Sequence, residues 1–248
     1  MKNFSFKTIS YALTAFAVAS TQALTADDEA DLYGDDVAEV SSTWDPFEPV
    51  NRVTFQFNDF LLSNAIKPIV DGYQWVTPQS VQEGAQNFFR NIRYPIRLGG
   101  NLLQGRLGGA WTETGRFAIN STVGVLGVFT PADDIEGLEP IPAEDLAQAL
   151  GAWGIGEGPY IVLPFVGPSN LRDTVGSIGD TAMNPLREPF SLVDSLNPEW
   201  EATLAVSELV VTSPSVVSAY ERAKASSIDP YSTIKNAYSQ LTRAKLKD

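Results

Sequence analysis

Few residue types in this chain of 248 residues could support catalysis. The sequence contains neither cysteine nor histidine, which excludes thiol nucleophiles, serine–histidine–aspartate triads, histidine bases and Cys/His zinc sites. Carboxylates are paired at Asp133 and Asp134 and again at Glu144 and Asp145. Adjacent acids are common near helix starts, where the helix dipole favours negative charge, so we do not interpret them as an acid–base pair. We therefore expect no enzyme, no cofactor and no metal.

Five arginines lie close together in a segment that contains a single acid. The arginines are Arg90, Arg93, Arg97, Arg106 and Arg116, and the acid is Glu113. Such a run usually marks a solvated helix face that pairs with acids elsewhere in the chain. The alternative is phosphate recognition, for which the forked donors of arginine are well suited. We favour the first interpretation.

The overall charge restricts the partners. The chain carries 17 basic and 30 acidic residues, a net charge of −13, and its isoelectric point is about 4.4. Binding to nucleic acid rests on basic side chains that neutralise phosphates, and docking on anionic lipid also needs positive charge. We therefore expect no nucleic-acid partner, and we expect any membrane contact to be hydrophobic or mediated by another protein.

The N-terminus has the three-part pattern of a secretory signal. Lys2 and Lys7 precede an apolar run at residues 9–19, and small residues follow it. The run is shorter than the roughly 20 residues that a spanning helix needs, so we favour a cleaved signal over a membrane anchor. We place the signal at residues 1–23, with the cleavage site left open, and an acidic, flexible leader at residues 24–43. A helical domain at residues 44–246 follows.

Proline placement and apolar periodicity predict that this domain is all-α. Seven prolines directly follow a side chain that suits a helix N-cap, a pair that is typical of helix starts and also of turns. The pairs are Asp45-Pro46, Thr77-Pro78, Thr130-Pro131, Asn184-Pro185, Asn197-Pro198, Ser213-Pro214 and Asp229-Pro230. After the last pair, Tyr231, Ile234, Tyr238 and Leu241 form one helical stripe. Alternating strand patterns are scarce, and residues 209–211 are the main ambiguity.

The segment from Val50 to Ile69 is predicted to be a helix that is apolar on two sides. One face consists of Val50, Val53, Phe57 and Phe60, and the other consists of Phe55, Leu62, Ile66 and Ile69. A helix of this kind lies centrally in a protein core or touches lipid, and the core is the commoner place.

Two apolar segments are rich in glycine and proline, although loops are usually polar. Residues 120–131 read NSTVGVLGVFTP, and residues 151–167 read GAWGIGEGPYIVLPFVG. A nucleotide-binding loop is disfavoured, because the second segment has neither GxGxxG spacing nor a following Lys-Ser/Thr pair. Two interpretations stay open for both segments: a buried connector, or an apolar surface beside a cavity or a membrane interface.

Five segments of the chain together resemble the MlaA/VacJ family of Gram-negative outer-membrane lipid-transport lipoproteins. They are DPFEPVNRVTFQFN (45–58), NFFRNI (87–92), GRFAINSTVGVLGVFTPA (115–132), LGAWGIGEGPYIVLPFVGPSNLRDTVG (150–176) and DPYSTIKNAYSQ (229–240). They extend from about residue 44 to residue 240 in the order of the family, and the glycine-rich segment is the most specific of them.

The resemblance implies a single ring-shaped, multi-helix domain with an amphipathic central channel, at the periplasmic face of the outer membrane. It implies intermembrane phospholipid transport, in which phospholipid mislocalised to the outer leaflet passes to a soluble periplasmic carrier and lipid asymmetry is maintained. Members of the family lie beside trimeric porins, so the implied partners are phospholipid, the outer membrane, a porin and a periplasmic carrier. The alternative functions are a soluble periplasmic lipid-binding carrier and a porin-associated structural scaffold.

The resemblance also implies where lipid is bound. We expect the channel or binding residues to be Phe57, Asn58, Val125, Leu126, Gly127, Val128, Phe129, Gly154, Gly156, Gly158, Tyr160, Leu163 and Phe165. We expect an arginine such as Arg93 or Arg172 to meet a lipid head group. A bulky residue at Gly127 or Gly156 is predicted to impair transport without unfolding the domain.

One feature departs from the family pattern. Members usually carry a cysteine at the mature N-terminus that receives a lipid anchor, and this chain contains no cysteine. We therefore expect attachment to the outer membrane through the two-faced helices and through partners, or a form that is soluble in the periplasm.

Overall fold

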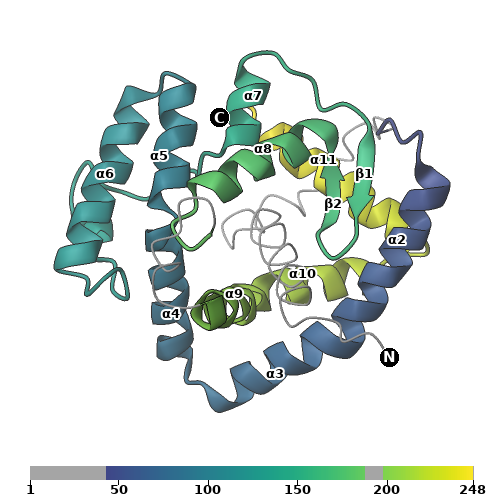
Figure 1. Ribbon diagram of the computed structural model, residues 1–248, viewed down its shortest axis with the longest axis horizontal. Coiled ribbons are helices and arrows are strands. Elements are labelled where there is room, and N and C mark those ends of the chain that lie inside the picture. Colours follow the sequence, from purple (N-terminus) through teal and green to yellow (C-terminus); the bar gives the residue numbers. More distant parts are fainter. Residues whose placement is uncertain (1–42, 188–197, 248) are drawn as a thin grey trace. The chain divides into compact units, whose positions relative to one another are not determined.

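The computed structural model describes residues 43–187 and 198–247. These residues are mostly helical, with a single antiparallel strand pair among them (Figure 1). The all-α class predicted from the sequence is confirmed, apart from this hairpin, which the scarcity of alternating patterns did not lead us to expect. The ambiguous residues 209–211 are helical. The predicted signal peptide and the leader up to residue 42 lie outside the described residues.

Helices make up the N-terminal half of the described chain. They are α2 (Glu48–Leu61), the π-helical turn η2 (Leu62–Ile66), α3 (Lys67–Val76), α4 (Gln79–Ile92), α5 (Tyr94–Leu103), α6 (Leu107–Thr122) and the 3₁₀ turn η3 (Pro131–Asp134). The second half consists of α7 (Leu146–Ala152), β1 (Tyr160–Leu163), β2 (Gly167–Asn170), α8 (Leu171–Met183), α9 (Pro198–Thr212), α10 (Pro214–Ala225) and α11 (Pro230–Ala244).

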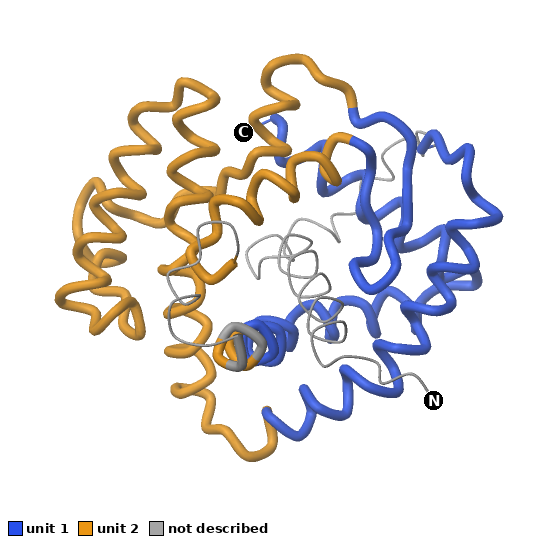
Figure 2. The backbone as a smooth tube through the Cα atoms, viewed as in Figure 1, with its two compact units in different colours: residues 1–73, 157–171, 205–248 blue, residues 74–156, 172–204 orange. Residues whose placement is uncertain are grey.

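The chain divides into two compact units, coloured blue and orange in Figure 2, and neither is a continuous segment. Unit 1 comprises residues 1–73, 157–171 and 205–248, and unit 2 comprises residues 74–156 and 172–204. From the sequence we expect one domain at residues 44–246. Sequence periodicity gives no sign of this division, because the chain passes between the units inside α3, α8 and α9, and a fourth time in the loop between α7 and β1.

Unit 1 has an aromatic and aliphatic core. Leu62, Ile66 and Val70 continue the buried stripe of α2 through η2 into α3, and they pack with Leu209 and Val217. A second cluster joins α2 to the hairpin and to α11, through Phe55, Tyr160, Val162 and Tyr231. Of the two apolar faces predicted for the helix at 50–69, one is buried at Phe55, Leu62 and Ile66, although its fourth member, Ile69, is exposed. The other face is exposed, so the central core position that the sequence favoured is wrong for that face.

Unit 2 is held together by close backbone approach. A Cβ atom at Gly100 of α5 would lie 2.6 Å from the backbone of Glu144, and one at Gly176 of α8 would lie 2.6 Å from Ala147 of α7. Only glycine permits such contacts, because any side chain would overlap the neighbouring segment. Between α5 and α6, the rings of Tyr94 and Phe117 stack with centroids 4.3 Å apart.

The proline pairs predicted helix starts better than they predicted caps. Helices α10 and α11 begin at Pro214 and Pro230 as expected, but neither preceding side chain caps its helix. Ser213 donates to the carbonyl oxygen of Leu209 instead. A side-chain cap is present at Asp145, which accepts from the backbone N–H of Gln148 at 2.7 Å. Asn197 lies outside the described residues.

Candidate functional site

The first candidate surface is the outer face of α2 in unit 1, which consists of Val50, Val53, Phe57 and Phe60. Val50, Val53 and Phe60 are 65%, 67% and 65% exposed, and Phe57 is 40% exposed. Because the opposite face of the same helix carries the buried Phe55, α2 is apolar on both sides and only one side is covered. Contiguous exposed apolar surface of this kind marks a place of contact with protein or membrane.

The second candidate surface is the apolar loop in unit 2, residues 123–130, between α6 and η3. Its side chains point outward: Val123, Val125, Leu126 and Phe129 are 68%, 59%, 63% and 63% exposed. No charged residue occurs between Arg116 and Asp133. The loop therefore presents an uninterrupted apolar tip to its surroundings.

The backbone of the apolar loop is strained. Val125, Leu126 and Gly127 have φ angles of 54°, 58° and 91°, three successive residues in the left-handed region. This conformation costs an L-residue roughly 1–2 kcal/mol, and it is rare for a β-branched residue such as Val125. Strain of this kind persists only where the surrounding structure imposes it, and it is concentrated at functional sites.

Buried asparagines of the neighbouring helices impose the loop conformation. Asn91 of α4 donates through Nδ2 to Ser121 Oγ at 2.8 Å and to the carbonyl oxygen of Leu126 at 3.3 Å. Asn120 of α6 accepts the backbone N–H of Gly127 on its carbonyl oxygen at 2.8 Å and that of Ala132 on Oδ1 at 3.1 Å. The loop thus satisfies its polar groups internally while its apolar side chains stay outside.

The glycine-rich segment 151–167 differs from the apolar loop, because its strand residues are largely buried. It runs from the end of α7 into the β1–β2 hairpin, where Tyr160 pairs with Asn170 and Leu163 with Gly167. Tyr160 and Val162 are buried in the core of unit 1, so they offer no surface to a ligand. Gly154 and Gly158, with φ angles of 85° and 70°, supply the left-handed turns that precede the hairpin. Gly156 is exposed, and a Cβ there would meet nothing within 4 Å.

Two asparagines of α2, seven residues apart, fasten strand β1 to the helix. Asn51 donates to the carbonyl oxygen of Tyr160 at 3.1 Å and accepts the backbone N–H of Val162 at 2.9 Å. Asn58 repeats the arrangement two turns later, on the carbonyl oxygen of Leu163 and the N–H of Phe165, both at 2.9 Å. Each amide therefore bridges two backbone groups as a neighbouring strand would.

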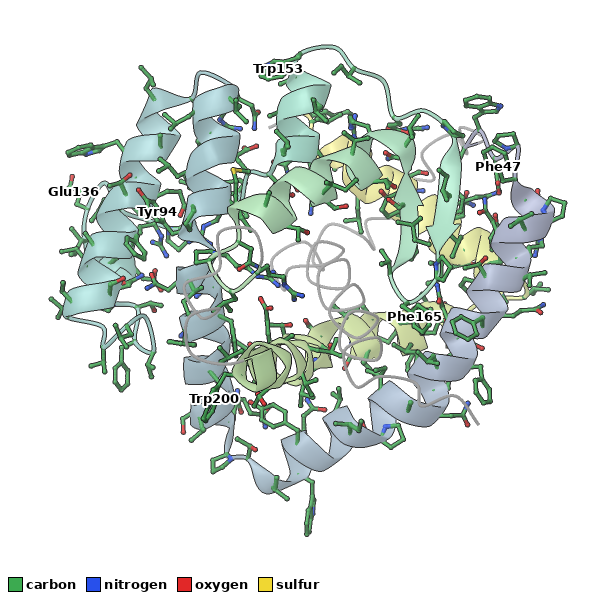
Figure 3. All side chains as sticks on the ribbon, viewed as in Figure 1. Phe47, Tyr94, Glu136, Trp153, Phe165 and Trp200 are labelled. Atoms are coloured by element: carbon green, nitrogen blue, oxygen red, sulfur yellow. The ribbon has the colours of Figure 1, made fainter. Side chains whose placement is uncertain are left out.

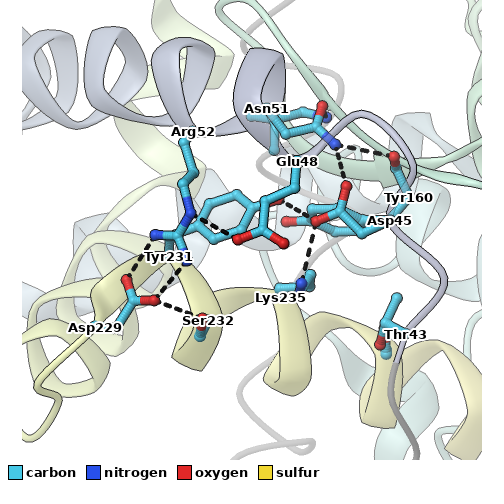
Figure 4. Close-up of polar contacts among 12 residues, drawn as sticks. Thr43, Asp45, Glu48, Asn51, Arg52, Tyr160, Asp229, Tyr231, Ser232 and Lys235 are labelled. Carbon is cyan, nitrogen blue, oxygen red and sulfur yellow. Dashed lines mark hydrogen bonds and ion pairs between the residues drawn. The ribbon is translucent and has the colours of Figure 1, made fainter.

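A polar network connects the same helix to α11 (Figure 4). Asp45 accepts from Asn51 at 2.8 Å, from Lys235 at 3.1 Å and from the hydroxyl of Tyr231. Burial, together with this hydrogen bond to Asp45, raises the pKa of Tyr231 above its ordinary value. The Asp45-Pro46 pair therefore holds the start of the described chain on unit 1 and does not cap a helix.

Arg52 and Asp229 form a second link between α2 and α11. Two guanidinium nitrogens of Arg52 contact the two carboxylate oxygens of Asp229 at 3.1 and 2.8 Å (Figure 4). The hydrogen bond from Arg52 is the largest cause that lowers the pKa of Asp229, and Ser232 adds a further hydrogen bond. Both side chains of the ion pair are about two-fifths exposed, so its contribution is screened by solvent.

Three of the five arginines pair with acids within unit 2, as the favoured interpretation predicted, but Arg97 and Arg116 are largely buried and not solvated. Arg97 contacts Glu113 at 2.8 Å, Arg116 contacts Asp133 at 2.6 Å, and Arg106 contacts the buried Glu144. One member of each carboxylate pair thus belongs to an ion pair. The structure consequently explains the clustered charges by packing.

The two arginines predicted to meet a head group lie in different settings. Arg93 is half-buried at the junction of α4 and α5. Arg172 is 4% exposed, and its guanidinium group donates to Asp173. A head group has no access to a side chain in that position, so the structure does not support Arg172 in this role.

The structure divides the predicted lipid-contact residues into three groups. The exposed ones are Phe57, Val125, Leu126, Phe129, Gly154, Gly156 and Gly158. Val128, Leu163 and Phe165 are half-buried, and Asn58, Gly127 and Tyr160 are buried. In Figure 3, Phe165 is seen beside α2, where its ring meets that of Phe57 edge-on at 5.1 Å.

Sequence reasoning missed Asn51, Asn91 and Asn120, and it listed Asn58 as a lipid-contact residue and not as a residue that shapes the backbone. Asn51, Phe55, Asn58 and Leu62 recur at helical spacing, so the two asparagines lie on the buried stripe of α2. A polar amide on such a stripe must find partners, and this signal could have identified them as positioning residues.

The described part of the chain contains neither an acidic metal site nor a helix that could span a membrane. In residues 43–187 and 198–247, no cluster of acidic side chains has the arrangement that would hold a metal ion. None of the helices in these ranges combines the length and hydropathy required to span a membrane.

Comparison with known proteins places the chain among bacterial relatives. An uncharacterized protein of Rickettsia bellii (strain RML369-C) is 31% identical over 209 residues, which cover 82% of this chain and 77% of that protein. The "Intermembrane phospholipid transport system lipoprotein MlaA" of Escherichia coli (strain K12) is 31% identical over 142 residues, 55% of each protein. The matched region thus spans about half the length of this curated relative.

A solved structure gives the same result at the level of the fold. It is described as "Structural basis for maintenance of bacterial outer membrane lipid asymmetry", and it superposes with a TM-score of 0.67 at 25% sequence identity. The alignment covers 82% of this chain and 98% of the other. The model of the MlaA lipoprotein family matches residues 43–245, nearly all of the described chain. The chain therefore belongs to the MlaA lipoprotein family.

Proposed function

We propose that this protein is a non-catalytic component of intermembrane phospholipid transport that contacts phospholipid through exposed apolar side chains. In this role it removes phospholipid from the outer leaflet of the outer membrane and passes it to a periplasmic carrier. The printed descriptions of the Escherichia coli relative and of the superposed structure support the role, and the family supports the setting.

The observation that carries the proposal is the apolar loop. An acidic protein that exposes Val125, Leu126 and Phe129 together, on a strained backbone, gains nothing in water from doing so. Acyl chains provide the apolar surroundings that these side chains lack. The outer face of α2 offers a second surface with the same chemistry.

The net charge of −13 supports a hydrophobic mode of contact. Anionic membranes attract basic segments, and this chain has an excess of acids. We propose that the protein acts at the periplasmic face of the outer membrane, with a trimeric porin as its neighbour there. Head-group contact by Arg93 belongs to the same proposal.

The test uses bacteria that lack the protein, in which phosphatidylethanolamine at the cell surface is labelled with an amine reagent that does not cross the membrane. Loss of the protein is expected to raise surface labelling, and the wild-type chain is expected to lower it again to the original level. The chain with the paired substitution Leu126→Ser and Phe129→Ser should leave the labelling high. Ile228→Ser is the matched control, because Ile228 is fully exposed and belongs to neither surface.

Each outcome bears on a different class of function. Unchanged surface labelling in cells without the protein would contradict a transport role and favour the scaffold. Full restoration by the paired substitution would contradict the lipid-contacting role of the loop. A wild-type protein that lowers surface labelling to the original level but washes off membranes without detergent would favour the soluble carrier.

A further inference from the structure

The turn of the hairpin has a phenylalanine, Phe165, in a backbone conformation that favours glycine. Residues 163–166 form a β-turn, closed by a hydrogen bond from the N–H of Val166 to the carbonyl oxygen of Leu163 at 3.3 Å. Pro164 occupies its second position and Phe165 its third, with a φ angle of 67°. A turn with proline second and a positive φ third normally has glycine at the third position, because a side chain there is strained.

Asn58 holds this strained turn through the backbone groups on both sides of Pro164. Its Nδ2 donates to the carbonyl oxygen of Leu163, and its Oδ1 accepts the N–H of Phe165. The side chain of Asn58 is buried, so both hydrogen bonds are partly shielded from competing water. Asn51 makes the equivalent pair of contacts to Tyr160 and Val162, where the backbone is a regular strand.

The conformation of the turn decides where the ring of Phe165 lies. The ring packs edge-on against Phe57, with centroids 5.1 Å apart and planes at 89°. It also packs against the core cluster formed by Leu62, Ile66, Val70, Leu209 and Val217. Phe57 is the least exposed residue of the outer face of α2. The ring of Phe165 covers part of Phe57 and so supports that face.

We propose that Asn58 is a positioning residue for lipid contact: it holds Phe165 in the left-handed conformation that supports Phe57 on the outer face of α2. The proposal rests on the proposed function, because it assigns the outer face of α2 to phospholipid. Asn51 makes two hydrogen bonds to the backbone of β1 and a third to Asp45, but it supports no strained residue. Asn51 therefore distinguishes positioning from simple anchoring.

The experiment compares Asn58→Ala with the matched control Asn51→Ala, and it has two measurements. Amide hydrogen exchange reports the turn itself. In Asn58→Ala the N–H of Phe165 should exchange roughly tenfold faster or more, because a buried hydrogen bond is lost, while the N–H of Val162 is unaffected. In Asn51→Ala the pattern should be reversed.

The second measurement reports lipid contact. Phe60, on the outer face, is replaced by the photo-reactive p-benzoyl-phenylalanine, and the protein is irradiated with vesicles of phosphatidylethanolamine and phosphatidylglycerol. The yield of protein–lipid product, per folded molecule, should fall severalfold in Asn58→Ala and stay at the parent level in Asn51→Ala. Equal losses in the two variants would overturn the proposal, because Asn58 would then be only an anchor.

A further variant guards against general unfolding. Phe165→Gly removes the need for the clamp, since glycine adopts a positive φ without strain. Adding this change to Asn58→Ala should slow the exchange of the Val166 N–H, whose hydrogen bond to Leu163 closes the turn, but should not return the lipid yield, because the ring is absent. A Val166 N–H that exchanges equally fast with and without Phe165→Gly would show that Asn58 does not act on the strained turn.

The two proposals fail in different ways. A parent protein that gives no lipid product at all would contradict phospholipid contact at the outer face of α2. The exchange pattern would still decide whether Asn58 holds the turn, and equal exchange at Phe165 in the parent and in Asn58→Ala would overturn that claim.

Discussion

The hairpin of unit 1 and the apolar loop of unit 2 are built by the same means and used differently. Each is an apolar segment interrupted by glycine or proline, each contains a non-glycine residue with positive φ, and each is fastened by buried asparagines from a helix. In the hairpin, Tyr160 and Val162 are buried in a core, whereas in the loop Val125, Leu126 and Phe129 are exposed.

This difference shows which property indicates function. Composition and backbone strain are common to both segments, so neither of them separates a structural segment from a surface that binds. Exposure separates them, because the backbone of the loop is strained while its apolar side chains remain exposed. The partner of the loop is therefore expected to supply that burial.

The largest expected effect distinguishes Asn51, which holds the hairpin, from Asn91, which holds the apolar loop. Asn51→Leu should lower the free energy of unfolding by about 3 kcal/mol or more, because a buried partner left unsatisfied costs about 1–3 kcal/mol and Asn51 has several such partners. Asn91→Leu should cost less, about 1–2 kcal/mol, because Asn91 has fewer partners and one of them, the carbonyl oxygen of Leu126, lies in a loop with an exposed tip. Urea unfolding measures both variants, and equal losses would contradict the distinction between core and surface clamp.

The next effect concerns two glycines that sequence analysis treats alike. Gly127→Val should cost about 2–3 kcal/mol, since a Cβ there would lie 2.3 Å from Asn91 Cβ and the residue has a positive φ. Gly156→Val should change stability by less than about 0.5 kcal/mol, because the position is open. Thermal unfolding checks the pair. A neutral Gly127→Val would mean that the loop is not held as described.

Both effects show where sequence reasoning succeeds and where it stops. Helical periodicity identifies the helices and the two-faced α2, because a repeat in the chain maps directly onto a helix face. The family motifs locate both apolar segments. Neither signal separates the buried Gly127 from the open Gly156, or Tyr160 from Leu126, because exposure depends on contacts with distant residues such as Asn91 and Phe55.

A smaller effect tests whether the loop is strained for function. Val125→Gly should stabilise the protein by about 0.5–1 kcal/mol, because it removes the cost of a left-handed β-branched residue but adds backbone entropy in the unfolded chain. Phe165→Gly in the hairpin should instead destabilise, because its ring packs on a core cluster. Calorimetry measures both changes. A destabilising Val125→Gly would contradict the assignment of strain.

The smallest effect concerns the exposed ion pair between α2 and α11, which supplements the amide clamps. The pKa of Asp229 is lowered from its ordinary value of 3.8, so the pair stabilises the folded state above that pH. The stabilisation is lost as the pH falls below 3.8 toward the lower folded-state pKa, and exposure limits it to less than about 1 kcal/mol.

Asp229→Asn is the variant that measures this contribution. Its free energy of unfolding should lie slightly below that of the parent at pH 7, and the difference should shrink at pH 3. A difference that grows on acidification would contradict the assigned direction of the pKa shift.

The central claim is that the exposed tip of the apolar loop contacts phospholipid. The most direct measurement places p-benzoyl-phenylalanine at Phe129 and, as a control, at Gln240, an exposed position on α11. Each protein is irradiated in its native membrane, and the labelled peptide is identified by mass spectrometry. Phospholipid attached at residue 129 and absent at residue 240 is the result that we predict. Products with protein alone at residue 129, or equal lipid labelling at both positions, would contradict the claim.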